Sequence, residues 1–105
     1  TRTRISDDYL FLPYVTLRYI EATGDTAILD EQIRYLSGPL LAEHEHEIYM
    51  VPTVSDQSGT LFEHCMKALD YGLKFGPHGI TLIGCGDWND GMNEVGHEGR
   101  GESIW

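Results

Sequence analysis

One stretch carries most of the information in this sequence: Gly84-Cys85-Gly86-Asp87-Trp88-Asn89-Asp90-Gly91-Met92-Asn93. It places two carboxylates, two carboxamides and an indole between glycines. Glycine permits positive φ and the close approach of a ligand. The indole offers a flat apolar face, and the carboxylates and amides offer directed hydrogen bonds. This combination is typical of a loop that binds a sugar and holds an acid near a glycosidic oxygen.

The core of this stretch, Gly-Asp-Trp-Asn-Asp-Gly at 86–91, resembles the catalytic loop of the inverting β-glycoside phosphorylases of glycoside hydrolase family 94. Three more stretches fit in family order: Arg2-Thr3-Arg4-Ile5-Ser6-Asp7-Asp8, Ser58-Gly59-Thr60-Leu61-Phe62-Glu63-His64-Cys65, and Gly96-His97-Glu98-Gly99-Arg100-Gly101-Glu102-Ser103-Ile104-Trp105. The resemblance therefore runs from end to end. Met92-Asn93 and the Gly-Arg-Gly-Glu-Ser tail look most like the β-1,2-glucan branch of the family.

The resemblance implies a mainly α fold, namely part of an (α/α)6 barrel whose long loops form the site. Residues 1–105 would then be a partial catalytic domain, truncated at both ends, and we expect the isolated chain to be inactive. The expected reaction is reversible, inverting phosphorolysis of β-linked glucosides that yields α-glucose 1-phosphate. The expected partners are a β-glucan oligosaccharide and phosphate, with inorganic phosphate as a co-substrate and no cofactor or metal.

Asp90 is the predicted catalytic residue. Cleavage of an acetal needs a proton on the departing oxygen, and a carboxylic acid with a raised pKa can supply it. A phosphorylase needs no second carboxylate as base, because phosphate is already a nucleophile. By resemblance, the acid is the aspartate that follows Trp-Asn, and Trp88 forms part of the sugar-subsite wall. Asp87 and Asn89 either bind sugar or fold the loop.

A second group of candidate site residues comes from the first stretch of the chain. By resemblance, an arginine and an aspartate of this stretch bind the hydroxyls of one glucosyl unit. Asp8 with Arg2, and then Arg4, are the predicted residues. A carboxylate accepts hydrogen bonds and a guanidinium donates them in a fixed fork, which suits this task. The alternative is that these residues cap a helix and form a surface ion pair.

Composition excludes several other classes of protein. The 105 residues carry a formal net charge of -10, which does not favour a nucleic-acid partner. No apolar run approaches the ~20 residues that a membrane span needs, so we expect no membrane contact by this segment. The expected location is cytoplasmic, with inner-membrane attachment if the parent is a membrane-bound glucan synthase, and the parent could be a homodimer. The spacing of His44 and His46 does not favour zinc.

Two alternatives to a phosphorylase remain open from the sequence. An inverting hydrolase on a similar helical barrel would need a second catalytic carboxylate, and none in this sequence stands out as a base. A non-catalytic carbohydrate-binding segment would bind glucan without turnover. The intact motif around Asp90 argues against the second alternative.

Local patterns predict a helix over about Tyr9–Ala22, capped by Asp7 or Asp8 and ended by Gly24. A short helix over about Thr26–Glu31 should follow, capped by Asp25. We expect residues 33–41 to be irregular, because they contain Gly38-Pro39.

Residues 48–54 should form a short strand or extended segment, which Pro52 restricts to a sheet edge. Ser58-Gly59-Thr60 should open a second helix with a capping box of Thr60 and Glu63. Gly76-Pro77 should end that helix. The apolar run at 80–83 should then lead into the loop that starts at Gly84.

Overall fold

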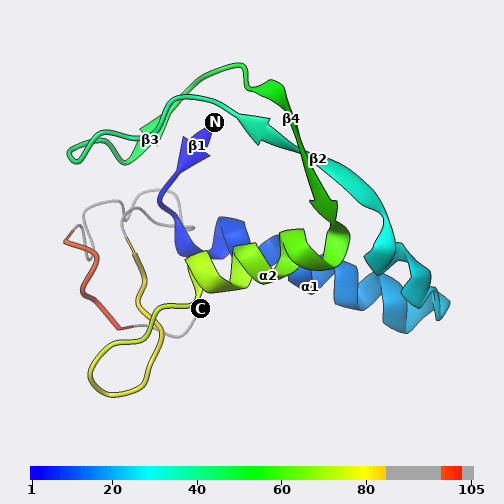
Figure 1. The fold of residues 1–105 in the computed structure, drawn as a ribbon. Coiled ribbons are helices and arrows are strands. Elements are labelled where there is room, and N and C mark those ends of the chain that lie inside the picture. The colour runs from blue at the N-terminus through cyan, green and yellow to red at the C-terminus, as the bar shows by residue number, and fades with distance from the viewer. Residues whose placement is uncertain (85–97, 103–105) are drawn as a thin grey trace.

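The computed structural model describes residues 1–84 and 98–102 (Figure 1). Within these residues the chain is mixed α/β rather than mainly α, with two α-helices, one 3-10 helix and two small antiparallel sheets. The elements in chain order are β1 (Arg2–Thr3), α1 (Ser6–Thr23), η1 (Thr26–Asp30), β2 (Gln32–Ser37), β3 (Glu47–Ile48), β4 (Thr53–Thr60) and α2 (Leu61–Gly72). The described part shows no closed helical barrel.

Helix α1 confirms the predicted first helix but starts earlier than expected. Its N-cap is Ile5, which makes no side-chain capping hydrogen bond, so the predicted cap at Asp7 or Asp8 is wrong. The carboxylate of Asp8 instead accepts a hydrogen bond from the Thr3 hydroxyl. Pro13 lies inside the helix, beyond its first turn. The helix ends as predicted at Gly24, whose φ of 72° is the left-handed conformation that glycine adopts most easily.

The segment expected to be irregular contains a strand. β2 pairs antiparallel with β4, with Gln32 opposite Thr60 and Ser37 opposite Thr53, and an irregularity lies between Arg34 and Leu36. Most of the residues of both strands are exposed. β4 lacks the alternating apolar pattern that marks a half-buried strand, and in β2 the alternation is limited to the four residues 32–35. The pairing with a distant partner forms this sheet, and Gly38-Pro39 only ends the first strand.

Helix α2 begins at Leu61 with the predicted capping box. Thr60 accepts from the Glu63 amide at 3.1 Å, and the Glu63 carboxylate accepts from the Thr60 amide at 2.8 Å. The residues just before Thr60 belong to β4 and not to the helix. The prediction that Gly76-Pro77 ends the helix is wrong, because α2 ends at Gly72. Beyond it, the chain turns back on itself: Phe75 pairs antiparallel with Thr81, and the Lys74 carbonyl accepts from the Leu82 amide at 2.7 Å.

Helices α1 and α2 lie side by side beneath the ribbon formed by β2 and β4 (Figure 1). The small core lies between the helices, where Leu61, Cys65 and Thr16 are buried. The Cys65 thiol and the Thr16 hydroxyl lie 3.6 Å apart. Large apolar side chains on the other faces stay exposed, among them Phe11 at 66% and Leu17 at 54%. Among the described residues, no helix is long and apolar enough to cross a membrane.

Candidate functional site

The run at 80–83 ends at Gly84, beyond which the predicted loop lies outside the described residues, and the position of this run is set by contacts with both ends of the chain. Gly84 pairs antiparallel with Ile5, the residue at the start of α1. Leu82 pairs antiparallel with Glu102, and the Ile83 amide donates to the Gly101 carbonyl at 2.8 Å. We call these paired segments, 80–84 and 99–102, the loop stem. The stem places Gly84, the first residue of the stretch at 84–93, beside the Arg2–Asp8 stretch.

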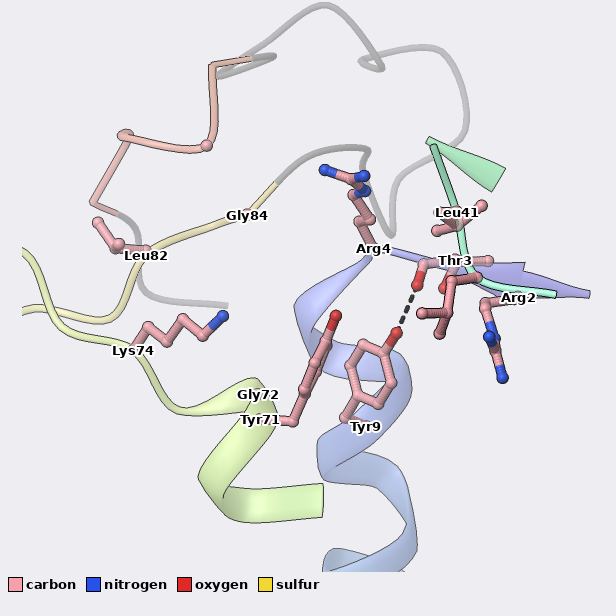
Figure 2. A pocket seen from close by; sticks show the side chains of 12 residues that line it. Arg2, Thr3, Arg4, Tyr9, Leu41, Tyr71, Gly72, Lys74, Leu82 and Gly84 are labelled. Carbon is pink, nitrogen blue, oxygen red and sulfur yellow. Dashed lines mark hydrogen bonds between the residues drawn. The ribbon is translucent and has the colours of Figure 1, made fainter. Parts of the chain in front are cut away.

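A cavity of about 630 Å³ opens where the loop stem meets the ends of both helices (Figure 2). Two arginines, a lysine and two tyrosines give it a cationic and aromatic lining. The residues that line it are Arg2, Thr3, Arg4, Tyr9, Leu40, Leu41, Tyr71, Gly72, Lys74, Leu82, Gly84 and Gly99. A cavity of this kind can stack a sugar ring against an aromatic side chain and donate hydrogen bonds to its hydroxyls.

Tyr9 and Tyr71 form the aromatic part of this lining. Their ring centroids lie 4.7 Å apart with an interplanar angle of 55°, a tilted arrangement that aromatic pairs favour. The Tyr9 hydroxyl donates to the Thr3 carbonyl (Figure 2). Burial raises the pKa of Tyr9, and the nearby Tyr71 and Asp8 raise it further. Tyr9 therefore stays a neutral hydrogen-bond donor at physiological pH.

Arg2 and Arg4 both line the cavity and also hold the loop at 38–42. The Arg2 guanidinium donates to the carbonyls of Gly38 at 3.2 Å and Pro39 at 2.6 Å. The Arg4 guanidinium donates to the Ala42 carbonyl at 2.6 Å. A guanidinium has five N–H donors, so each arginine keeps donors for a ligand. The two predicted arginines thus have a structural task at the edge of the candidate site.

Lys74 is a cationic group that the sequence reading did not select. Its ammonium lies 4.9 Å from the centroid of the Tyr71 ring, within the range of a cation–π contact. Figure 2 shows Arg4, Tyr71 and Lys74 around the same opening. Nothing in the local sequence singles out Lys74, because it follows the end of α2 and is brought to the cavity only by the turn that leads to the loop stem. Tyr9 could have been suspected from its place next to Asp8.

Arg2 and Asp8 also meet in a second, smaller cavity of about 280 Å³. The Thr3 hydroxyl donates to Asp8 there at 2.5 Å, and among the described side chains neither arginine forms an ion pair with Asp8. The surface ion pair considered as an alternative for this stretch is therefore absent between them. The predicted pairing of Asp8 with Arg2 on one glucosyl unit stays a prediction.

The other predicted site residues, Asp87, Trp88, Asn89 and Asp90, lie outside the described residues.

Comparison with known proteins decides the family. The model of the glycosyl hydrolase 94 superfamily, catalytic domain, matches residues 1–105, which is the whole chain. The chain belongs to this superfamily. The resemblance first noticed in the motif at 86–91 is thereby confirmed.

The relatives place this glycosyl hydrolase 94 chain among sugar-active proteins. It is 44% identical over 99% of its length to the cyclic beta-(1,2)-glucan synthase NdvB of Rhizobium meliloti. It is 33% identical over 95% of its length to the solabiose phosphorylase of Paenibacillus borealis, and equally to the cellobionic acid phosphorylase of Neurospora crassa. The chain spans only 4% of the first relative and 11% and 10% of the other two.

Proposed function

We propose that this chain is part of the catalytic domain of an inverting glycoside phosphorylase that acts on β-1,2-glucan. Two findings support the proposal: membership of the superfamily over all 105 residues, and the identity of 44% to a cyclic beta-(1,2)-glucan synthase. Other relatives are named as phosphorylases. The parent is then a free phosphorylase or the phosphorylase part of a glucan synthase. The remaining helices of an (α/α)6 barrel would come from other parts of the parent.

In the proposed reaction, inorganic phosphate attacks the anomeric carbon of the terminal glucosyl unit. A phosphate oxygen forms a bond to that carbon on the face opposite the glycosidic oxygen, and the bond to the glycosidic oxygen breaks. Asp90 transfers its proton to the departing oxygen, which becomes a hydroxyl of the shortened glucan. Attack from the opposite face converts the β-linkage into α-glucose 1-phosphate. The reverse reaction lengthens the glucan.

The pairing of Gly84 with Ile5 is the structural observation that supports this proposal best. It brings the start of the Asp90-containing motif to the stretch that contains the predicted sugar-binding residues Arg2, Arg4 and Asp8. The cavity beside it has the aromatic and hydrogen-bonding lining that a sugar needs. In this arrangement Trp88, Asp87 and Asn89 would complete the subsite from the loop. We place the phosphate-binding residues in other parts of the parent.

The test uses the full-length protein that contains this chain, supplied with β-1,2-gluco-oligosaccharide or cellobiose, each with and without phosphate. We expect release of glucose 1-phosphate from the β-1,2 substrate only when phosphate is present. Release from cellobiose instead would keep the reaction type and overturn the substrate assignment. Release of free glucose without phosphate would identify a hydrolase and overturn the proposal.

A further inference from the structure

We infer that Glu102 is a positioning residue that clamps the loop stem and thereby sets the place of the motif that contains Asp90. This inference rests on the proposed function for its effect on catalysis. Glu102 does not line the cavity of about 630 Å³. Its role must therefore act through the backbone that leads to the site.

The Glu102 carboxylate binds one residue of the turn between α2 and the loop stem through two separate hydrogen bonds. Its Oε1 accepts from the His78 backbone amide at 2.9 Å, and its Oε2 lies 2.5 Å from Nδ1 of the His78 ring. The side chain of Glu102 is only 14% exposed, whereas that of His78 is 78% exposed. The hydrogen bond with the His78 side chain, together with backbone amides, lowers the pKa of Glu102. The carboxylate is therefore held ionised against this turn.

The turn itself is shaped to receive the Glu102 side chain. A Cβ added to Gly76 would lie 2.3 Å from Oε1 and 2.4 Å from Cγ of Glu102. Contacts below 3.0 Å force a shift of one partner, so only a glycine leaves room for the carboxylate here. The Gly76 amide donates to the Ile80 carbonyl at 2.9 Å, which closes the turn around this space. Gly76 and Glu102 thus fit as a pair.

Backbone pairing extends this clamp to the candidate site. Leu82 pairs with Glu102 in the stem, and the Leu82 amide also donates to the Lys74 carbonyl. Two residues further along the same segment, Gly84 pairs with Ile5. Glu102 therefore joins the turn at 76–80 to the stem, and the stem carries the start of the motif to the edge of the cavity. Loss of the carboxylate should loosen this connection while the cavity-lining side chains stay unchanged.

The first experiment compares Glu102→Ala with Glu102→Gln and His78→Ala in the full-length protein, at a temperature well below unfolding. We expect Glu102→Ala to lower kcat by about tenfold to about a hundredfold, since displacement of a reacting group by ~1 Å costs on that order. The KM for the glucan should change by less than about twofold, because no binding group is removed. Glu102→Gln should restore most of kcat, because its amide oxygen can accept from the His78 amide and its amino group can donate to Nδ1. His78→Ala keeps the hydrogen bond from the residue 78 backbone amide and loses the one from the ring, so its kcat should lie between those of Glu102→Ala and Glu102→Gln.

The second experiment measures amide hydrogen exchange of Leu82 and Ile83 in the same variants, and its result does not depend on any activity. We expect faster exchange in Glu102→Ala and protection close to the wild type in Glu102→Gln. Unchanged exchange in Glu102→Ala would overturn the clamp. Faster exchange with unchanged kcat would overturn the positioning role, and a merely structural role would lower stability without the kcat effect.

The two proposals can fail separately. The wild-type protein could lack phosphorolytic activity while Glu102→Ala still shows faster amide exchange than the wild type and Glu102→Gln does not. That result would overturn the proposed function and support the positioning of the loop stem by Glu102. Gly76→Ala offers an independent check, since the added methyl group should displace the Glu102 carboxylate and reproduce the faster exchange of Glu102→Ala. Normal protection in Gly76→Ala would contradict the fit of Gly76 with Glu102.

Discussion

The start of α2 and the loop stem are stabilised by the same kind of bond but across different distances in the chain. At the start of α2, Thr60 and Glu63 exchange hydrogen bonds across three residues. In the stem, Glu102 reaches back to His78 across 24 residues, and Gly84 pairs with Ile5 near the other end of the chain. The first arrangement can form in an isolated segment, whereas the second requires the surrounding fold. The region that carries the proposed chemistry is thus the one that depends most on distant contacts.

This difference predicts that substitutions in the motif at 86–91, which follows the loop stem, affect activity, while substitutions at the start of α2 affect stability.

The largest effect should follow from Asp90→Asn, which removes the proposed acid. We expect kcat for phosphorolysis in the full-length protein to fall by about 10²–10⁴-fold, the usual contribution of a positioned proton donor. The check is glucose 1-phosphate release under saturating glucan and phosphate. Asp56→Asn, an exposed change in β4, is the matched control and should keep full activity; full activity in Asp90→Asn would overturn the assignment of the acid.

The next effect should appear in the core between the helices. Leu61 is 9% exposed at the first position of α2, and Leu61→Ala leaves a cavity there. We expect the free energy of opening of α2 to fall by about 2–4 kcal/mol, measured by amide exchange in the full-length protein. Phe62→Ala is the matched control, because Phe62 is 52% exposed and should cost much less. Equal losses in the two variants would mean that another part of the parent covers Phe62.

A smaller effect should follow from loss of the N-cap of α2. Thr60→Ala removes the acceptor of the Glu63 amide and should cost about 1 kcal/mol in the same exchange measurement. Thr60→Ser keeps the hydroxyl and should remain near the wild type. The amides of Leu82 and Ile83 in the stem should be unaffected, because the two hydrogen bonds of the cap join only Thr60 and Glu63. Loss of stem protection in Thr60→Ala would contradict the independence of the two regions.

The smallest effect should be the pH dependence of the stem. The pKa of Glu102 is lowered in the folded protein by its hydrogen bond with His78, so its ionised form stabilises the fold. This stabilisation is complete above the ordinary glutamate pKa of about 4.3 and is lost as the pH falls through the lowered value. We expect the protection of Leu82 in the wild type to fall as the pH is lowered below about 4.3, whereas Glu102→Gln, which has no carboxyl group at this position, should keep its protection over the same range. The same pH dependence in the two proteins would show that protonation of Glu102 does not control the stem.

The sequence predicted well those features that depend on neighbours along the chain. The helix over α1, its end at Gly24 and the capping box at Thr60 and Glu63 were all visible as local patterns. The predicted end of α2 differs because Gly76-Pro77 is a strong stop signal, yet the helix ends at Gly72 and the residues that follow pair with residues 80–82. Local signals show where a helix can end, and the pairing of the residues that follow it is not visible in those signals.

The sheet of β2 and β4 was not predicted, because it forms through pairing between segments more than fifteen residues apart. Both strands are largely exposed, and β4 reads Thr-Val-Ser-Asp-Gln-Ser-Gly-Thr, which lacks apolar alternation. The alternation at residues 32–35 of β2 is too short to decide the structure, and β4 shows none, so the backbone pairing between the two strands is what identifies them. The expectation of a mainly α fold came from the complete barrel of the family, whereas the described residues contain two small sheets beside the two α-helices.

The family could be identified from the sequence alone, because the motif at 86–91 and the stretches that accompany it resemble those of glycoside hydrolase family 94 in the same order. The predicted acid at Asp90 and the predicted sugar ligands rest on that resemblance and stay predictions. The structure added Tyr9, Tyr71 and Lys74 to the candidate site and joined Glu102 to His78 beside the loop stem. Apart from Tyr9, which directly follows Asp8, only the tertiary structure could select these residues, because the cavity lies where the two ends of the chain meet the ends of both helices, and residues far apart in sequence become neighbours only after the chain has folded.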